Sequence, residues 1–287
     1  MSLSSHPLIL PAPAKINRFL HIIGRRADGY HQLQTLFQFL DYGDELTFER
    51  SHHLELETPL PELRTENNLI LQAGRLLQQK TGCTKGAYIT LDKKLPMGGG
   101  VGGGSSNAAT ALLGLNQLWG LGLDEDALAE LGLQLGADVP VFVRGRSAFA
   151  EGVGEELTPV NPSEPWYLVL IPNVHVNTAA MYGHEDLTRD SRPIKVSAAL
   201  DQAGRNDFQP LVRRLYPEVD NCLTLLDNFA QESMGSAMLS GSGACVFAPY
   251  ATRDKALVTL KAIGSQAKGF VARGINSSPL HTALSGR

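Results

Sequence analysis

A run of glycines near residue 100 is the part of the chain best suited to chemistry. Six of the seven residues at 98–104 are glycine, and Ser105, Ser106 and Asn107 follow them. Glycines carry no Cβ atom, so their backbone N–H groups can approach a ligand closely. The small residues after them open an apolar helical pattern, and the N-terminus of a helix attracts anions. The segment therefore predicts a backbone cradle for phosphate.

The glycine pattern alone does not fix the kind of cradle. A Walker A loop ends in Gly-Lys-Ser/Thr, whereas Gly104 is followed by Ser105. The pattern G-x-G-x-x-G is met, but a run this rich in glycine meets almost any glycine pattern. The acidic residues about twenty positions on, Asp124 and Asp126, open a helix instead of ending a strand. A flexible linker is the alternative interpretation. It is disfavoured because an alternating strand pattern at 87–91 precedes the run and a helix follows it.

Three motifs, in order along the chain, resemble those of the GHMP small-molecule kinases. The first is Pro13-Ala14-Lys15-Ile16-Asn17, the second is the glycine run, and the third is LSGSGACVF at 239–247. Other stretches narrow the resemblance to the branch of the family that phosphorylates a cytidyl diphosphate ester of methylerythritol. These stretches are RADGYH at 26–31, LF at 36–37, GADVPVF at 136–142 and SPLH at 278–281. Together the motifs cover nearly the whole chain.

The resemblance implies an α+β fold of two domains, with the active site in the cleft between them. We expect an N-terminal GHMP kinase domain at 1–160, which carries the glycine-rich phosphate loop, and a C-terminal GHMP kinase domain at 161–287. The polar, proline-rich stretch at 158–165 is the best boundary. The implied activity is ATP-dependent phosphorylation of the 2-hydroxyl of the cytidyl ester, a step of the non-mevalonate route to isoprenoid precursors. The implied cofactors are ATP and Mg²⁺.

Two charged residues are the catalytic candidates. Taken alone, Asp138 before Val139 and Pro140 is more often a turn or cap residue than a base. The resemblance reverses that expectation, because the family's catalytic aspartate falls in this motif. Lys15 has apolar neighbours, which do not suit a solvated charge. A cation near Asp138 would keep the carboxylate ionised and polarise the attacking hydroxyl, so we expect a Lys15–Asp138 pair at the acceptor oxygen.

The remaining site residues fall into two groups. Expected ATP-binding residues are Asn68, Leu69, Pro96, Met97, Gly98, Gly99, Gly100, Val101, Gly102, Gly103, Gly104, Ser105 and Ser106. Expected substrate-binding residues are Asn17, Tyr30, His31, Phe37, Tyr182, Ser240 and Gly241. The two serines either offer a hydroxyl to Mg²⁺ or phosphate, or simply cap the helix. Tyr30 and His31 resemble the family's cytosine-binding pair, although each aromatic residue could instead be plain core. We expect no metal site built from protein ligands alone, since His6 and His52-His53 lack partners at metal-ligand spacing.

The composition is typical of a metabolic enzyme. The chain has 287 residues, of which 43% are hydrophobic, enough for two ordinary domains. A formal net charge of -4 does not suggest a nucleic-acid footprint. The three widely spaced cysteines fit a reducing compartment. No signal peptide and no apolar run of membrane-helix length is evident. We therefore expect a cytoplasmic monomer or weak homodimer with a small-molecule substrate and neither nucleic-acid nor membrane partners.

The elements that must position these groups follow from hydrophobic periodicity. Alternation predicts strands over 16–22, 46–48, 87–91 and 146–152, and continuous apolarity predicts a buried strand over 166–171. Asn67-Asn68 and Asp124 each precede a helical pattern as caps do. Further along, the sequence predicts a hairpin-like segment over 238–250, a helix over 255–263 and a last strand near 270–272.

Overall fold

The computed structural model describes residues 6–27, 29–201 and 204–285, and within them one mixed sheet of ten strands connects all parts of the molecule. The strand order is β3-β4-β2-β10-β7-β9-β8, while β1 pairs with β2, and β5 pairs with β2 and β6. The strands are β1 (Leu8–Arg25), β2 (His31–Ser51), β3 (Leu54–Glu57), β4 (Gly86–Asp92), β5 (Ala148–Glu151), β6 (Glu156–Pro159), β7 (Trp166–Ile171), β8 (Met238–Leu239), β9 (Val246–Tyr250) and β10 (Lys268–Ile275).

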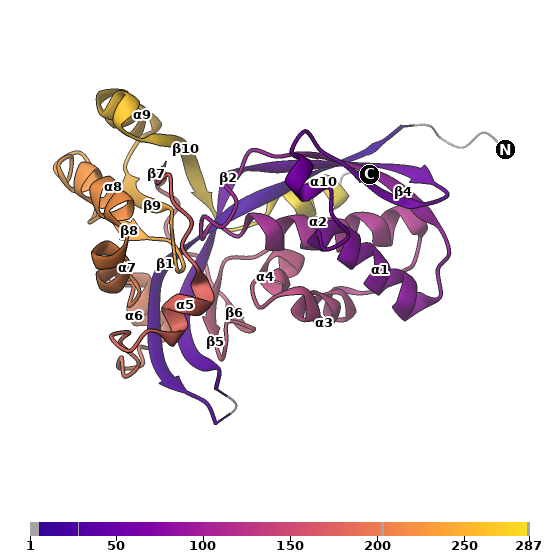
Figure 1. Cartoon of the computed structure of the whole chain (residues 1–287), viewed down its shortest axis with the longest axis horizontal. Coiled ribbons are helices and arrows are strands. Elements are labelled where there is room, and N and C mark those ends of the chain that lie inside the picture. The colour runs from indigo at the N-terminus through magenta and orange to yellow at the C-terminus, as the bar shows by residue number, and fades with distance from the viewer. Residues whose placement is uncertain (1–5, 28, 202–203, 286–287) are drawn as a thin grey trace.

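Helices cover the sheet in two groups (Figure 1). The first group is α1 (Leu69–Thr81), α2 (Gly103–Trp119), α3 (Glu125–Leu135) and α4 (Val139–Arg144). The second group is α5 (Thr178–Gly183), α6 (Val196–Asp201), α7 (Gln209–Leu215), α8 (Pro217–Asp227) and α9 (Arg253–Ile263). The short 3-10 turns are η1 (Pro61–Leu63) and η2 (Gly264–Gln266). This mixture confirms the α+β prediction.

Two helix caps appear where the sequence predicts them. The Asn68 side chain accepts a hydrogen bond from the Ile70 amide at 2.9 Å, at the start of α1. The Asp124 side chain likewise accepts from the Ala127 amide at 2.8 Å, at the start of α3. Each contact satisfies an amide that has no partner within its helix, which typically contributes about 1 kcal/mol. The predicted strand over 166–171 coincides with β7.

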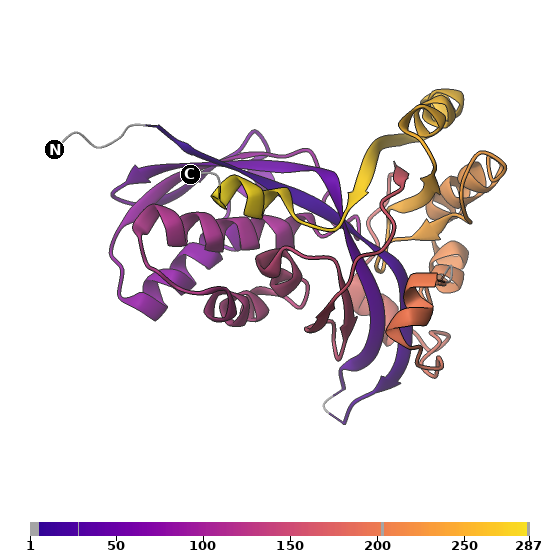
Figure 2. The same ribbon diagram turned by 180° about the vertical axis from the view of Figure 1, so that it is seen from behind.

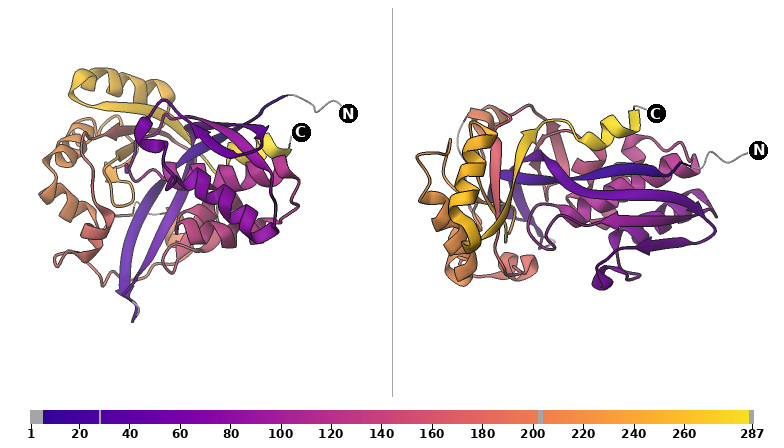
Figure 3. Two further views of the ribbon diagram at one scale, coloured as in Figure 1. Left: turned by 45° about the vertical axis from the view of Figure 1, so that its right-hand side comes forward. Right: turned by 90° about the horizontal axis from the view of Figure 1, so that it is seen from above.

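The strands β1 and β2 form a long antiparallel hairpin that joins the two groups of elements (Figures 1 and 3). Leu10 of β1 is buried in the core beneath α2, whereas Leu20 and Ile22 of the same strand are buried with β7, α7 and α8. The pairing of β1 with β2 shifts register between Pro13 and Lys15 and again between Asn17 and Leu20. Irregularities of this kind turn side chains away from the regular pleat. The motif at 13–17 therefore lies in an irregular part of the hairpin.

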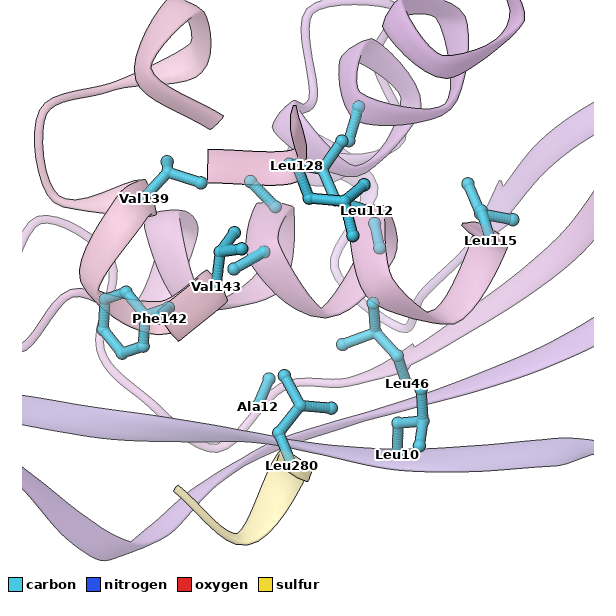
Figure 4. Packing of buried hydrophobic residues seen from close by; sticks show 14 of the residues in the cluster. Leu10, Ala12, Leu46, Leu112, Leu115, Leu128, Val139, Phe142, Val143 and Leu280 are labelled. Atoms are coloured by element: carbon cyan, nitrogen blue, oxygen red, sulfur yellow. The ribbon is translucent and has the colours of Figure 1, made fainter. Parts of the chain in front are cut away.

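Close packing of α2 against the sheet depends on a glycine. A Cβ atom at Gly114 would lie 2.8 Å from the ring of Phe48, so the helix approaches the strand only because that atom is missing. Figure 4 shows Leu112 and Leu115 of α2 within this core. Fully burying one such leucine stabilises the fold by about 1.5–3 kcal/mol. This packing fixes the direction of α2 and hence the place of its N-terminus.

The helix α10 (Pro279–Ser285), which the sequence analysis did not predict, returns to the first group of elements. Figure 2 shows it, in yellow, beside the N-terminal strands and away from α9. Leu280 is buried in the same core as Leu10 and Ala12 (Figure 4). The division of the chain at residue 160 stays a prediction, and these cores mix segments from both sides of it. No helix in the described part of the chain is long and apolar enough to cross a membrane.

Candidate active site

A cleft of about 850 Å³ lies where the irregular part of the hairpin meets the glycine loop. Segments that lie far apart in the sequence line it: β1, β2, the start of α1, the loop at 96–105, the start of α4, the segment 175–182 and the turn 241–243. The three motifs singled out from the sequence therefore converge on one cavity.

Along the glycine loop, the backbone angle φ alternates between positive and negative values, and only glycine adopts the positive values readily. Gly98, Gly100 and Gly102 have φ values of 64°, 72° and 74°, and the residues between them do not have positive φ. Side chains disfavour this left-handed region by about 1–2 kcal/mol per residue. Alternation of this kind turns successive N–H groups toward one side, which makes a concave anion site.

The carbonyl groups of the loop are turned the other way, toward the protein. The Gly99 oxygen accepts from the Cys245 amide at 3.0 Å, and the Gly100 oxygen accepts from the Ser240 hydroxyl at 2.9 Å. The Val101 oxygen accepts from the Lys15 amide at 3.0 Å. Because each of these oxygens accepts a hydrogen bond from the protein, its negative partial charge is offset, which lowers its repulsion of an anion in the cleft. The first and third motifs thus support the second.

The ammonium group of Lys15 lies at the centre of the site and is almost completely buried. It forms an ion pair with Asp138 at 3.0 Å and donates to the Asn17 side-chain oxygen at 2.6 Å. The Gly100 carbonyl, at 3.4 Å, accepts a second hydrogen bond. These two hydrogen bonds and the ion pair hold the charge in place. The ring of Phe37, 5.0 Å from the nitrogen, adds a cation–π contact.

Asp138 occupies the position before α4 without capping it. Its side chain makes no hydrogen bond to the amides of that helix, and it pairs with Lys15 instead. The side chain is 35% exposed and lines the cleft, whereas its partner is only 3% exposed. The carboxylate is therefore accessible to a ligand in the cleft, while the buried ammonium of Lys15 holds it in place. This geometry decides against the cap interpretation of Asp138.

Asn17 lines the cleft, and its side chain links Lys15 to β2. Its amide nitrogen donates to the Thr35 hydroxyl at 2.9 Å, and its oxygen accepts from Lys15. Thr35 in turn donates to the Phe19 carbonyl at 2.5 Å. This chain of contacts orients the amide of Asn17, so its oxygen faces the cation.

Most of the other predicted site residues lie along the cleft. The residues that line it are Asn68, Leu69, Pro96, Met97, Gly98, Gly99, Gly100, Gly102, Gly103, Gly104, Ser105, Phe37, Tyr182 and Gly241. Those not among its lining residues are Val101, Ser106, Tyr30, His31 and Ser240. Ser240 is completely buried beneath the loop. Gly102 precedes α2 as its cap residue, so neither Ser105 nor Ser106 has the capping position.

The aromatic residues proposed for the cytidyl group have different surroundings. The ring of His31 stacks on that of Tyr182, with 4.9 Å between centroids, and Tyr182 packs edge-on against Phe208. Burial, with a further contribution from the charge of Asp138, raises the pKa of Tyr182. Burial, with a further contribution from Arg189, lowers the pKa of His31. Tyr30 is 66% exposed, which excludes the plain-core interpretation of that residue.

Sequence reasoning missed several residues of the cleft. Lys93 lines it, and its ammonium is 2.6 Å from a carboxylate oxygen of Asp44. Burial lowers the pKa of Lys93, while Asp44 opposes that shift. A Cβ atom at Gly103 would be 3.1 Å from this ammonium, so the cation lies beside the start of α2. No sequence signal distinguishes Lys93 from its exposed neighbour Lys94. Thr35, Asn107, His175, Asn177, Thr178 and Ser242 also line the cleft.

Comparison with known proteins agrees with this arrangement. A family model described as "GHMP kinases N terminal domain" matches residues 68–146, and one described as "GHMP kinases C terminal" matches 185–268. A 4-diphosphocytidyl-2-C-methyl-D-erythritol kinase of Ectopseudomonas mendocina is 57% identical over 279 residues, which are 96% of this chain and 94% of that protein. A kinase of the same name from Pseudomonas syringae pv. syringae is 56% identical over 284 residues, covering 98% and 99%.

Solved structures show the same relation. A structure described as 4-(cytidine 5'-diphospho)-2C-methyl-D-erythritol kinase superposes with a TM-score of 0.82 at 31% identity, covering 93% of this chain and 98% of that one. A mevalonate kinase superposes with a TM-score of 0.69 at 16% identity, covering 94% and 100%, which shows a shared fold alone.

Fold, motifs and cleft are those of a small-molecule kinase of the GHMP superfamily. The sequence identity and coverage of the relatives narrow the assignment to one family within this superfamily. The chain belongs to the family of the 4-diphosphocytidyl-2-C-methyl-D-erythritol kinases.

Proposed function

We propose that the protein transfers the γ-phosphoryl group of ATP to the 2-hydroxyl of 4-diphosphocytidyl-2-C-methyl-D-erythritol. This step belongs to the non-mevalonate route to isoprenoid precursors. Family membership supports the substrate, and one observation carries the chemistry. The Lys15–Asp138 pair, at 3.0 Å, lies in the same cleft as the glycine loop. A phosphate cradle alone would bind a nucleotide; the pair beside it supplies a base.

Phosphoryl transfer needs positioning and charge more than covalent participation by the protein. The substrate hydroxyl attacks the γ-phosphorus while the bond from that phosphorus to the β–γ bridging oxygen breaks, and ADP leaves. Asp138 takes the proton of the hydroxyl. The neighbouring charge of Lys15 offsets the negative charge that develops on the attacking oxygen. Because hydrogen bonds to Asn17 and Gly100 hold its ammonium beside Asp138, Lys15 acts through a fixed charge at the carboxylate.

The N–H groups of the glycine loop and the start of α2 bind the phosphates of ATP. Their carbonyls are tied back by the Cys245 amide, the Ser240 hydroxyl and the Lys15 amide. We place the adenine near Asn68 and Leu69, which line the same cleft. Asn68 also caps α1, so its amide is already oriented by the Ile70 amide and the Leu63 carbonyl.

The residues at the start of α2 also fit a Mg²⁺ ion. The Asn107 side-chain oxygen is buried and finds no hydrogen-bond partner among the described residues, although Asn107 lines the cleft. Ser105, in the first turn of α2, and Asp138 line it too. Oxygen ligands of this kind, completed by phosphate oxygens and water, suit Mg²⁺. When bound, the ion neutralises charge on the phosphates.

The cytidyl group is assigned to the aromatic end of the cleft. Tyr182 and Phe37 line the cavity, and His31 stacks on Tyr182. Tyr30, next to His31 and largely exposed, supplies a ring for stacking on the base. The histidine ring supplies a hydrogen bond to the base edge. Gly241, which also lines the cleft, leaves room for the diphosphate and polyol.

The test is ADP release from ATP measured with a panel of acceptors: the cytidyl ester, homoserine, mevalonate and galactose. The proposal predicts rapid turnover with the cytidyl ester and background release with the other three. Faster turnover with any of the other acceptors would refute the assigned substrate. Absence of turnover with every acceptor, in a protein that binds ATP, would refute the kinase assignment itself.

A further inference from the structure

Arg189 follows α5 and is not among the residues that line the cleft, yet all five of its N–H donors have acceptors. Its Nε donates to the Nε2 atom of His31 at 3.0 Å, and its two terminal nitrogens donate to four backbone carbonyls. Those carbonyls belong to Tyr182, His184, Leu187 and Glu185, at 2.9, 2.7, 3.0 and 3.4 Å. A guanidinium with every donor engaged is held rigidly.

The contact with His31 determines where the histidine proton resides. A guanidinium stays protonated in proteins and has no acceptor atom. The Nε2 atom of His31 must therefore carry the lone pair in this contact, which leaves Nδ1 as the N–H of the neutral ring. A proton on Nε2 would place two donors 3.0 Å apart. Burial and the charges of Arg189 and Arg25 lower the pKa of His31, in agreement with a neutral ring.

The same side chain also holds the backbone of Tyr182, whose ring is the partner of His31. Arg189 donates to the carbonyl of Tyr182, whose ring stacks on His31 with an interplanar angle of 27°. Tyr182 is further held by Phe208, at 4.9 Å and 84°. One guanidinium therefore connects two residues 151 positions apart, the first residue of β2 and a residue of α5 that lines the cleft.

We propose that Arg189 is a positioning residue for substrate specificity: it fixes His31 as a hydrogen-bond donor through Nδ1 and holds that ring against Tyr182. This rests on the proposed function, in which the two rings meet the cytidyl base. A donor at Nδ1 pairs with the unprotonated ring nitrogen N3 of cytosine. Uracil presents an N–H at N3, so a fixed donor opposes it there. The contact thus favours a cytidyl over a uridyl ester.

The first test needs no substrate and leaves Arg189 in place. Two-bond ¹⁵N–¹H correlation spectra of the ¹⁵N-labelled protein at pH 7.5 report the tautomer of each histidine, and the spectrum of His31→Gln assigns the signals of His31. We expect the wild-type ring to be neutral, with its proton on Nδ1. A proton on Nε2, or on both nitrogens, would overturn the proposal.

The second test compares Arg189→Met with Arg192→Met, in which an exposed arginine of the same segment is removed. In Arg189→Met, we expect a mixture of both tautomers and a KM for the cytidyl ester raised about tenfold, as for one lost hydrogen bond. The KM for ATP and kcat should stay within about twofold, and Arg192→Met should match wild type throughout. Discrimination against the uridyl ester should fall in Arg189→Met alone.

The alternative is a purely structural role for Arg189. It predicts a lower melting temperature and equal losses of affinity for ATP and the cytidyl ester, and that result would overturn the proposal. An unchanged tautomer with an unchanged KM in Arg189→Met would do the same. Failure of wild type to phosphorylate the cytidyl ester would refute the proposed function instead, while the tautomer of His31 would still decide the Arg189 contact.

Discussion

Replacement of Gly100 by alanine tests whether the loop's shape depends on its support by the third motif. A Cβ atom at Gly100 would lie 2.1 Å from the Ser240 carbonyl oxygen and 2.9 Å from that of Gly243. Both are backbone atoms, so no side-chain rotation relieves the overlap. The loop must move by about 1 Å to reach ordinary contact distance, and overpacking of this kind costs about 1–3 kcal/mol. The shift also breaks the 2.9 Å hydrogen bond from the Ser240 hydroxyl, for about 0.5–1.5 kcal/mol.

Gly120→Ala is the matched control. Gly120 has nearly the same φ, 68° against 72°, but nothing lies within 4 Å of the position its Cβ would take. It therefore reports the left-handed strain alone, about 1–2 kcal/mol. Isothermal calorimetry with ATP and with the cytidyl ester separates the two substrates. For Gly100→Ala we expect the ATP affinity to be about 30-fold lower than that of the control. This factor corresponds to roughly 2 kcal/mol of binding free energy lost because the loop is displaced. Affinity for the cytidyl ester should fall much less. Equal ATP affinity in the two variants would refute the reasoning.

Three further perturbations test other parts of the account. Lys15→Met should lower kcat about a hundredfold or more, and combining it with Asp138→Asn should cost less than the two single losses together, because the pair acts as a unit; additive losses would contradict the pairing. Tyr30→Ala should weaken binding of the cytidyl ester by about 1–3 kcal/mol in calorimetry without lowering the melting temperature, since the ring is 66% exposed; a lower melting temperature would contradict this. Burial lowers the pKa of His21 from 6.5, although the charge of Asp207 opposes that shift. As the pH falls below 6.5, the unfolded chain therefore binds more protons than the folded one, and the stability of the fold decreases. His21→Gln should make the melting temperature decline less steeply between pH 7 and 5.5, and an unchanged slope would contradict this prediction.

The sequence was sufficient to predict those features of the structure that depend only on residues close together in the chain. The caps Asn68 and Asp124 act within three residues of their own position, so the local pattern determines them. The phosphate loop is also local, since its φ values require glycine whatever surrounds it. By contrast, the assignment of catalysis to Lys15 and Asp138 came from family resemblance. Nothing in their spacing places two residues 123 positions apart at 3.0 Å.

The residues that sequence reasoning missed depend on contacts between distant segments. Lys93 resembles its neighbour Lys94 in sequence, and only the approach of Asp44 distinguishes it. Nothing in the sequence indicated that Ser240 would be buried with its hydroxyl donating to the Gly100 carbonyl, a contact between residues 140 positions apart. The terminal helix α10 is seven residues long, and it is held by packing of Leu280 more than by any intrinsic helical signal.

The central claim is that Asp138 is the base of a phosphoryl transfer, and Asp138→Asn tests it most directly. Asparagine keeps the size of the side chain and an oxygen that can accept from Lys15, 3.0 Å away, but it cannot take a proton. Steady-state ADP release with ATP and the cytidyl ester should show kcat reduced by about 10²–10⁴-fold, with both KM values nearly unchanged. Turnover within a fewfold of wild type would show that Asp138 is a structural residue and that the proposed chemistry is wrong.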